Sequence, residues 1–434
     1  MKRLTIVATT VCALAPAAPA AAQPPSPACR TAGAPCPAAA VGTARGLVRT
    51  PTLWWPVTPG RVGEGPVGWR VAPEKGATSP TADGGTAART VGGGTAARTG
   101  EGGAVAAGGE PGWRVAVAGQ TQGFGGFQDV GSTGPGHAWV TRVGMSLLRW
   151  NGRAWRAAGG AAVPYLVTTV GTREAWQFVE TPGKLDARHY EAGAGWHAHP
   201  IAAEAHATAA VATAPGDCWV AALKFGPRGM ADVVWHWAGG RWQQVSTPAP
   251  ITDLAANGRN DVWALSSLAP DGGARVPSIM HWTGHGWRTT AVRGLTTPAD
   301  SYTELDDVLA TGRKEAYAVG AIVASKGGLR EGVVLRWNGT EWNRVDQHPA
   351  GIGFTRVARD GTGGLWLATR RQGGSDVLTH YARGGWGELA VQPPMGTTNV
   401  EVRGLANVPG TTAMWATAQA GGSDVTRQLI LSYR

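Results

Sequence analysis

Acidic side chains gather at one point of the sequence, where Glu304, Asp306 and Asp307 fall within four residues. Carboxylates that alternate along a strand point to one face, so this set could bind a cation near an axis. A solvated or salt-bridged role is the other interpretation, and we favour it. Glu304 and Asp306 are therefore kept as candidate ligand-facing residues, and no metal or cofactor is predicted.

Histidines form a second group, since His197, His199 and His206 lie close together in the sequence. Imidazole is a common zinc ligand, but no partner carboxylate is obvious nearby, so we do not predict a metal site. The sequence also contains no G-x-S-x-G, P-loop, H-E-x-x-H or C-x-x-C motif. It therefore predicts no catalytic residue.

The elements that must position these side chains are short strands. Residues 251–292 contain four runs rich in β-branched and aromatic residues, ITDLAA, DVWALSSL, SIMHWTG and WRTTAV, bounded by Gly, Asn, Asp or Pro. No apolar stripe runs at helical spacing. One four-stranded sheet cannot bury its own faces, but several sheets stacked radially around an axis can.

Aromatic residues recur at three matched points of this unit. The second-strand aromatics are Trp139, Trp176, Trp219, Trp263, Tyr317, Trp366 and Trp415. The third-strand aromatics are Trp150, Tyr190, Trp237, Trp282, Trp337, Tyr381 and Tyr433. The fourth-strand aromatics are Trp155, Trp196, Trp242, Trp287, Trp342 and Trp386. Seven second-strand marks predict an all-β, seven-bladed β-propeller of four-stranded antiparallel blades over residues 108–434.

The last unit lacks a fourth strand, because the chain ends at LILSYR. The segment GEPGWRVAVAG around Trp113 resembles the fourth strands and directly precedes the first unit. We therefore expect this N-terminal strand to complete the last blade. A second copy, GPVGWRVAP around Trp69, competes for that position, and the copy nearer the first blade is favoured.

A basic residue precedes the third-strand aromatic in six of the seven units. These residues are Arg149, His189, His236, His281, Arg336 and His380, with Ser432 in the seventh unit. Such a set could form a ligand or metal ring, but mid-strand positions in separate blades would lie well apart. We expect each of them to hydrogen-bond to a polar neighbour on the adjacent blade.

The N-terminal region predicts export. Residues 1–22 have a charged start, an apolar stretch and small residues before Gln23, as in a secretory signal. Residues 23–107 are rich in Pro, Ala, Gly and Thr and predict a largely disordered linker. Cys29 and Cys36 could form a disulfide there. Cys218, beside a second-strand Trp, is predicted to be a buried, inert thiol.

The net charge of +10 divides unevenly along the chain. The signal contributes +2, residues 23–107 contribute +4, and the remaining +4 is spread over the propeller. This balance and the predicted export argue against nucleic acid as a partner. The basic tail could associate weakly with an anionic cell envelope, and no segment is apolar for long enough to span a membrane.

Tryptophan is abundant, and 17 of the 21 occupy the recurring positions or Trp113. Packing between blades therefore explains most of them, including Trp113, Trp139, Trp176, Trp219, Trp263, Trp287, Trp366 and Trp415. Trp235 stands outside the pattern. The longer connections between second and third strands, such as Lys224–Met230, would carry ligand contacts, so Trp235 and Lys224 are candidate ligand-facing residues.

The repeats DVWAL…IMHWTGHGW, EAYAVG…VLRWNGTEW and CWVA…VWHWAGGRW resemble those of secreted bacterial β-propeller proteins. More distantly they are similar to tectonin lectin propellers and to the kelch-type propeller of galactose oxidase. The kelch double-Gly signature and a copper-binding set of Tyr, His and Cys are not evident. The resemblance covers about three quarters of the chain and implies a binding role outside the cell.

The sequence thus predicts a secreted, non-catalytic β-propeller that acts as an extracellular binding scaffold for a protein or a cell-surface polysaccharide. A carbohydrate-binding, lectin-like propeller is the first alternative. A propeller enzyme with its site at the axial mouth is the second.

Overall fold

The computed structural model describes residues 111–120, 126–142, 145–158, 164–181, 183–227, 229–266, 277–290, 292, 295–345, 351–422 and 425–434. Every described residue belongs to one compact unit, which spans Gly94–Arg434. The signal, the linker, Trp69 and the pair Cys29 and Cys36 lie outside the described residues, so those expectations remain predictions.

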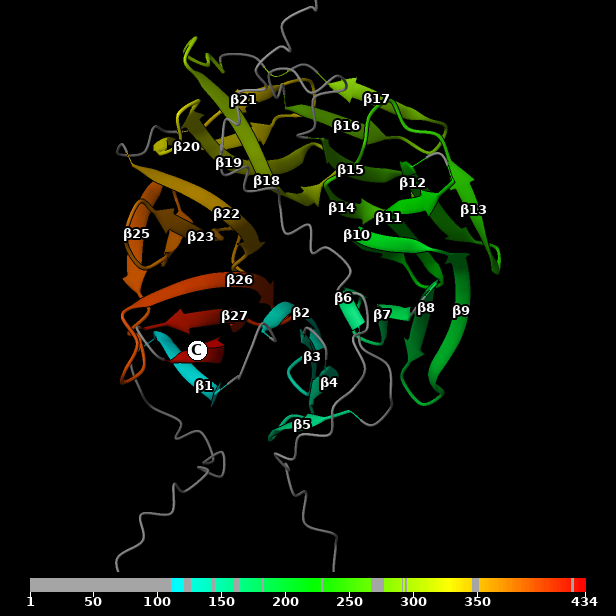
Figure 1. The fold of residues 1–434 in the computed structure, drawn as a ribbon, viewed down its shortest axis with the longest axis horizontal. Helices are drawn as coiled ribbons and strands as arrows, with labels where there is room; N and C mark the ends of the chain where they lie inside the picture. The colour runs from blue at the N-terminus through cyan, green and yellow to red at the C-terminus, as the bar shows by residue number, and fades with distance from the viewer. Residues whose placement is uncertain are drawn as a thin grey trace, which may run out of the picture. The chain divides into compact units, whose positions relative to one another are not determined.

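Seven four-stranded antiparallel sheets surround one centre (Figure 1), as the sequence predicted. All regular elements of the described residues are strands. Blade one comprises β2 (Phe127–Gly134), β3 (His137–Arg142), β4 (Met145–Trp150) and β5 (Trp155–Ala157). Blade two comprises β6 (Pro164–Val170), β7 (Glu174–Thr181), β8 (Lys184–Glu191) and β9 (Gly195–Ala203). Blade three comprises β10 (Ala205–Ala214), β11 (Asp217–Gly226), β12 (Gly229–Ala238) and β13 (Arg241–Val245).

The remaining blades repeat this order, with the first strand innermost and the fourth outermost (Figure 1). Blade four comprises β14 (Asp253–Gly258), β15 (Asp261–Ser266), β16 (Ser278–Trp282) and β17 (Trp287–Thr290). Blade five comprises β18 (Ser301–Gly312), β19 (Glu315–Ala324), β20 (Leu329–Trp337) and β21 (Trp342–Arg344). Blade six comprises β22 (Ile352–Arg359), β23 (Leu365–Arg371), β24 (Val377–Ala382) and β25 (Gly385–Ala390).

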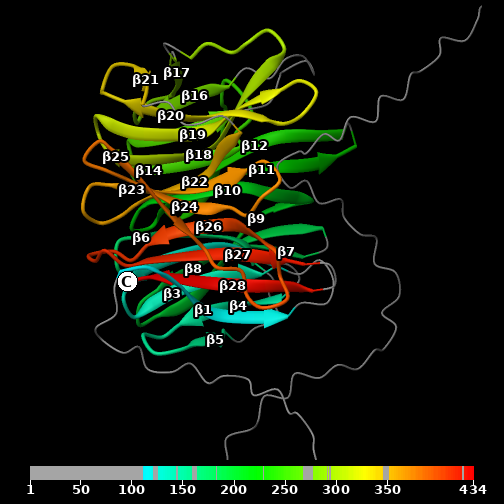
Figure 2. The same cartoon turned by 90° about the vertical axis from the view of Figure 1, so that its left-hand side faces the viewer.

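Blade seven joins the two ends of the described chain. Its strand order is β1-β28-β27-β26, built from β1 (Trp113–Gln120), β26 (Asn399–Asn407), β27 (Met414–Gly421) and β28 (Thr426–Tyr433). Trp113 pairs with Tyr433, and the ladder runs on to Gln120 opposite Arg427. Figure 2 shows β1 beside β28 in a second view. The prediction that the N-terminal strand completes the last blade is confirmed.

The core lies between successive blades and is built on the recurring aromatics. Each second-strand aromatic packs against the third- and fourth-strand aromatics of the next blade. The Trp263 ring, for example, lies 5.0 Å from Trp337 and 5.1 Å from Trp342. Trp366 contacts Tyr433 and Trp113 in the same way, at 4.8 and 5.4 Å. The strand from the N-terminus therefore supplies a missing packing partner as well as hydrogen bonds.

The burial of each recurring Trp depends on which strand of the blade carries it. The second-strand residues Trp139, Trp176, Trp219, Trp263, Trp366 and Trp415 are buried, whereas Trp113 and Trp287 on outer strands are half-buried. A fully buried Trp removes about 150–250 Å² from water. At about 25 cal/mol/Å² this is worth roughly 4–6 kcal/mol as an upper bound. These six side chains therefore form the main apolar contacts between blades.

The basic residue before each third-strand aromatic bonds mostly within its own blade, which corrects the expectation of partners on adjacent blades. His281 Nε2 lies 2.7 Å from Asp261 Oδ1, and its ring stacks on Trp263 at 3.8 Å. The same acid–histidine pair occurs as Glu174–His189, Asp217–His236 and Asp360–His380. The register explains this, because the His lies directly opposite the second-strand Trp and reaches the acid near the start of that strand.

The two arginines of this set behave differently from each other. Arg336 follows the histidine pattern, with Nη2 at 2.7 Å from Glu315 of its own blade. Arg149 alone reaches the adjacent blade, where it donates to the Tyr190 hydroxyl at 3.4 Å.

Candidate functional site

A cleft lies between blades two and three, with one contribution from blade four. Its volume is about 580 Å³, within the range of small-molecule sites. Its polar and aromatic lining comes from His189, Glu191, His197, His199, Asp217, Trp237 and Arg259. The turn at Gly239 and Gly240, between third and fourth strands, also lines it. The cleft thus lies at the ends of the blades that carry the short turns, opposite the longer connections singled out from the sequence.

His189 on β8 is held rigidly in the wall of the cleft. Its side chain is buried, and Nε2 lies 2.8 Å from Oε2 of Glu174. Nδ1 lies 3.6 Å from Oε1 of Glu191, and the ring stacks on Trp176 with centroids 4.2 Å apart. Two carboxylates and one indole therefore fix the orientation of this imidazole.

His197 and His199 extend the same wall along β9. They alternate along the strand, and His197 pairs directly with His189 in the register, so all three side chains share the face toward blade three. The His199 ring lies 4.4 Å from Trp237 and 6.2 Å from His189. Burial lowers the pKa of His199, and the neighbouring His189 and His197 lower it further. His199 therefore favours its neutral form.

His199 is an exception within the repeat. It stands three residues after the fourth-strand aromatic of its blade. Other blades have at that position Ala158, Val245, Thr290, Val345 and Leu389. An imidazole in place of a small or apolar side chain marks blade two as specialised. The sequence did contain this signal, but it appears only when the fourth strands are compared position by position.

Asp217 lines the cleft and is the acceptor of a hydrogen-bonded group there. Its Oδ1 accepts from the Thr213 hydroxyl and lies 3.0 Å from His236 Nε2. The His236 ring stacks on Trp219 with centroids 4.0 Å apart. Arg259 Nε lies 3.7 Å from the other carboxylate oxygen. Asp217 is thus buried, with two hydrogen-bond partners on Oδ1 and the Arg259 guanidinium within ion-pair distance of Oδ2.

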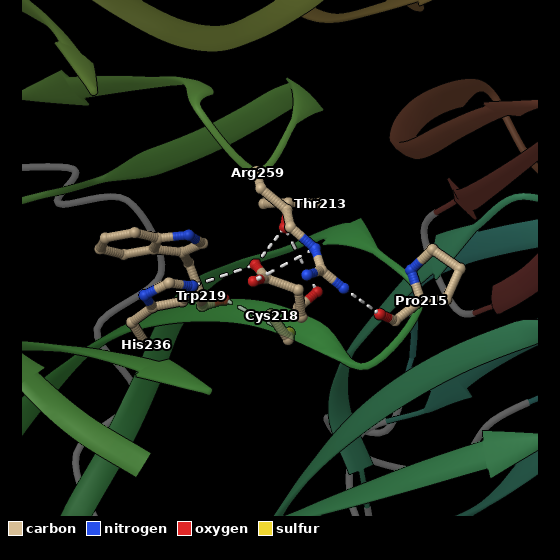
Figure 3. Close-up of polar contacts among 7 residues, drawn as sticks. Thr213, Pro215, Cys218, Trp219, His236 and Arg259 are labelled. Carbon is tan, nitrogen blue, oxygen red and sulfur yellow. Dashed lines mark hydrogen bonds and ion pairs between the residues drawn. The ribbon is translucent and has the colours of Figure 1, made fainter. Parts of the chain in front are cut away.

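Arg259 enters the site from the β14–β15 turn of blade four. Its Nη2 donates to the Pro215 carbonyl at 2.8 Å, which holds the side chain across the turn that precedes β11 (Figure 3). Its side chain is still 59% exposed, so the guanidinium can meet a ligand. Cys218 lies beside Asp217 but is buried, and burial followed by the charge of Asp217 raises the pKa of its thiol well above the ordinary value. This thiol is therefore unreactive.

The structure places Trp235 and Lys224 away from the cleft. Trp235 is only 6% exposed and packs in the interface between blades two and three, near Phe178. It shares the face of Trp237, two residues further on, and that face packs on blade two, so Trp235 belongs to the core instead of facing a ligand. Lys224 is exposed near the far end of β11, whose first residue, Asp217, lies in the cleft.

The acids of β18 lie at a β-bulge near the propeller axis. The register shifts between Leu305 and Asp307, so Asp306 is the extra residue and the regular alternation assumed from the sequence is interrupted. Burial raises the pKa of Asp306 to about 6. Glu304 precedes the bulge. None of these acids reaches the cleft.

Carboxylates around the axis join neighbouring blades. Asp129, Asp253 and Asp307 each accept a backbone N–H from the innermost strand of the next blade. The donors are Val167 at 3.2 Å, Val308 at 2.8 Å and Val357 at 2.7 Å. Within the described residues, no group of three or more His, Cys, Asp or Glu side chains is arranged to hold a metal ion.

No protein-family model and no curated protein matches the chain. Solved structures match it in fold. YCF48 bound to a D1 peptide is 14% identical, with 73% of this chain and 96% of that chain covered and a TM-score of 0.48. The GH74 xyloglucanase from Xanthomonas campestris is 13% identical, with coverages of 72% and 54% and a TM-score of 0.49.

The SapL1 lectin in complex with alpha methyl fucoside is also 13% identical, with coverages of 63% and 98% and a TM-score of 0.42. Enzymes and lectins therefore both occur among the similar structures, and at these identities the likeness shows the fold alone. The class that the blades define is the seven-bladed β-propeller. Among the described residues, no helix is long and apolar enough to cross a membrane.

Proposed function

We propose that the protein is a secreted, non-catalytic binding propeller that holds an extracellular ligand in the cleft between blades two and three. The observation that carries this proposal is the convergence of His199, Trp237 and Arg259 from three different blades on one cleft. A rigid scaffold that gathers an aromatic face and several hydrogen-bonding groups is suited to recognition.

The state of the carboxylates favours binding over catalysis. Asp217 already accepts from Thr213 and is paired with His236, and Glu191 lies near His189. Acid–base catalysis needs a carboxyl group or imidazole poised to exchange a proton with the substrate. In this proposal both carboxylates orient imidazoles, and the exposed Glu191 also accepts a hydrogen bond from a ligand hydroxyl.

The alternative of a propeller enzyme with its site at the axial mouth receives less support. Asp129, Asp253 and Asp307 each accept a backbone N–H of the next blade, which gives each of them a role in holding the ring together. Arg356 likewise donates from Nε to the Arg403 carbonyl of blade seven at 2.7 Å. These contacts support a structural role for the axial polar groups.

A carbohydrate is the ligand class that we place first, ahead of a protein. The Trp237 indole is half-buried beside the His199 imidazole, and acceptor and donor groups surround it. An aromatic face with hydrogen-bonding groups at its edge fits a sugar ring, which has an apolar face and a hydroxyl rim.

A binding experiment tests the proposal with matched variants. The mature chain would be screened on a glycan array and by pull-down with cell-envelope polysaccharide, alongside Arg259→Ala and His199→Val. Valine occupies the position of His199 in blades three and five, so the fold should accept it. Both variants should lose at least tenfold in affinity, whereas Lys224→Ala should bind normally. Binding that depends on Lys224 and is indifferent to the cleft variants would refute the proposal.

A further inference from the structure

The cleft contains more potential positive charge than negative charge. Three imidazoles and one guanidinium line it, those of His189, His197, His199 and Arg259. Two carboxylates face them, those of Glu191 and Asp217, and the carboxylate of Glu174 lies behind His189. His236 also lies beside Asp217. The question is which of these groups the protein already uses.

The carboxylates are the groups that the protein has paired. Glu174 bonds Nε2 of His189 at 2.8 Å, and Glu191 lies 3.6 Å from its Nδ1. Asp217 is shared by Thr213 and His236. Within the described residues, the rings of His197 and His199 have no hydrogen-bond or ion-pair partner. Donors are therefore left over in the cleft.

Arg259 adds a further donor. Among the residues that the structure describes, its one hydrogen bond runs from Nη2 to the Pro215 carbonyl at 2.8 Å, and Asp217 lies 3.7 Å from Nε. The guanidinium keeps donor capacity toward the open side of the cleft, where 59% of the side chain is exposed. A planar guanidinium matches a carboxylate through two parallel hydrogen bonds, which a lysine cannot reproduce.

We propose that the cleft binds a saccharide that bears a carboxylate, a uronate unit, with Arg259 and His197 at the carboxylate and Trp237 with His199 under the sugar ring. This inference rests on the proposed function and deepens it by naming the ligand class. The leftover donors account for the anion, and Trp237 and Glu191, which line the same cleft, account for the sugar ring and its hydroxyls. A neutral sugar would leave the guanidinium without a matching acceptor.

Acidity should strengthen this binding. Burial, His189 and His197 lower the pKa of His199, so the ring is neutral at pH 7.5 and gains a proton as the pH falls. A carboxylate ligand stays ionised above about pH 4 and favours the protonated imidazole. The other groups facing the site are His189, His197, Glu191, Asp217 and Arg259, with Glu174 and His236 behind them.

Calorimetry with a matched pair of ligands tests the inference. The mature chain would be titrated with a galacturonic acid trimer and with the neutral galactose trimer of the same linkage, at pH 5.5 and pH 7.5. The acidic trimer should bind at least tenfold more tightly than the neutral one, and more tightly at pH 5.5. Arg259→Lys should remove most of this preference, and His199→Val should flatten the pH dependence.

The outcomes separate this inference from the proposed function. Equal affinity for the two trimers, with Arg259→Ala abolishing both, overturns the uronate assignment and leaves the cleft as the binding site. Failure of both trimers to bind also overturns the assignment, and the glycan-array result with the same variants then decides the function independently. A preference for a sulfated galactose trimer over the uronate trimer would likewise overturn the carboxylate assignment.

Discussion

At the scale of single residues, the acids that join neighbouring blades are buried. Burial disfavours their charged form, and hydrogen bonds from the next blade oppose this effect. Asp376 illustrates the balance, since its Oδ2 accepts the Val402 N–H at 2.8 Å while the side chain is only 5% exposed. Burial raises its pKa to about 7, and the hydrogen bond from Val402 opposes that shift. Asp129 shows the same balance, with its pKa raised to about 6 by burial. Such groups bind protons more tightly in the folded state than in the unfolded chain.

The sign of the pH dependence follows from this difference. A carboxyl group whose folded pKa is raised contributes stability that is fully present below its unfolded value of about 3.9. That contribution is lost as the pH rises toward 6 and 7, the pKa values of Asp129 and Asp376. The free energy of unfolding, measured with urea, should therefore fall between pH 4.5 and pH 8 through these groups. Asp376→Asn should weaken this fall by an amount on the order of 1–4 kcal/mol.

The control for that measurement is Asp300→Asn, because Asp300 is exposed at the surface beside Arg330. The exposed substitution should leave the slope with pH unchanged. A wild-type slope retained in Asp376→Asn would show that Asp376 does not titrate between these pH values.

At the scale of elements, the innermost strand of blade five needs a glycine opposite its bulge. Gly320 on β19 faces Leu305, where the register of β18 shifts. A Cβ at Gly320 would lie 1.9 Å from the Glu304 carbonyl oxygen, and that oxygen is backbone. The bulge and the glycine are therefore one feature made by two strands. It breaks the alternation at Asp306, and Asp307 beyond it accepts the Val357 N–H of blade six.

Gly320→Ala tests this feature. The new methyl group cannot be accommodated without moving β18, so the substitution should cost more than about 2 kcal/mol in the free energy of unfolding. Gly312→Ala is the matched control at the end of the same strand pair, because a Cβ there meets nothing within 4 Å. Chemical denaturation of both variants measures the difference. Equal stabilities would mean that the bulge relaxes freely.

The bulge also explains what could not be predicted from the sequence at this scale. The strands and their aromatic marks follow from local patterns, so their number and order were predictable. A bulge shifts by one residue the alternation of side chains between the two faces of a strand, and it needs no change of composition. The sequence pattern therefore assigned Asp306 and Asp307 to the wrong positions in this alternation. Trp235 was misplaced for another reason, because only the neighbouring blade reveals that its face is covered.

At the scale of the whole molecule, β1 closes the ring. It covers the outer edge of β28 and brings Trp113 against Trp366 of blade six, 5.4 Å away. Without β1, Tyr433 and Trp366 would each lose an aromatic neighbour. The closing strand therefore contributes to the interface between blades six and seven as well as to one sheet.

Truncation separates the closing strand from the segment before it. A chain that begins at residue 108 should melt at the temperature of the mature chain, because the sequence predicts a largely disordered linker over residues 23–107. A chain that begins at residue 121 lacks β1 and should lose about 4 kcal/mol or more, because Trp113 and a full strand of hydrogen bonds are missing. Differential scanning calorimetry distinguishes the two. An unchanged melting transition in the shorter chain would show that β1 is dispensable.

The candidate cleft could not be assembled from the sequence, although each of its residues could be read there. His199 and Arg259 are 60 positions apart and belong to blades two and four. Their meeting depends on the rotation between successive blades and on the turn that holds Arg259 against Pro215. The repeat pattern predicts that successive blades pack together. It does not predict which turn of one blade contacts the neighbouring blade.

The closing strand also determines when the ring can close during synthesis of the polypeptide. β1 is the first described strand in chain order and β28 is the last, and the two pair with each other. The ring therefore cannot close before β28 has been synthesised, however early the first blades form.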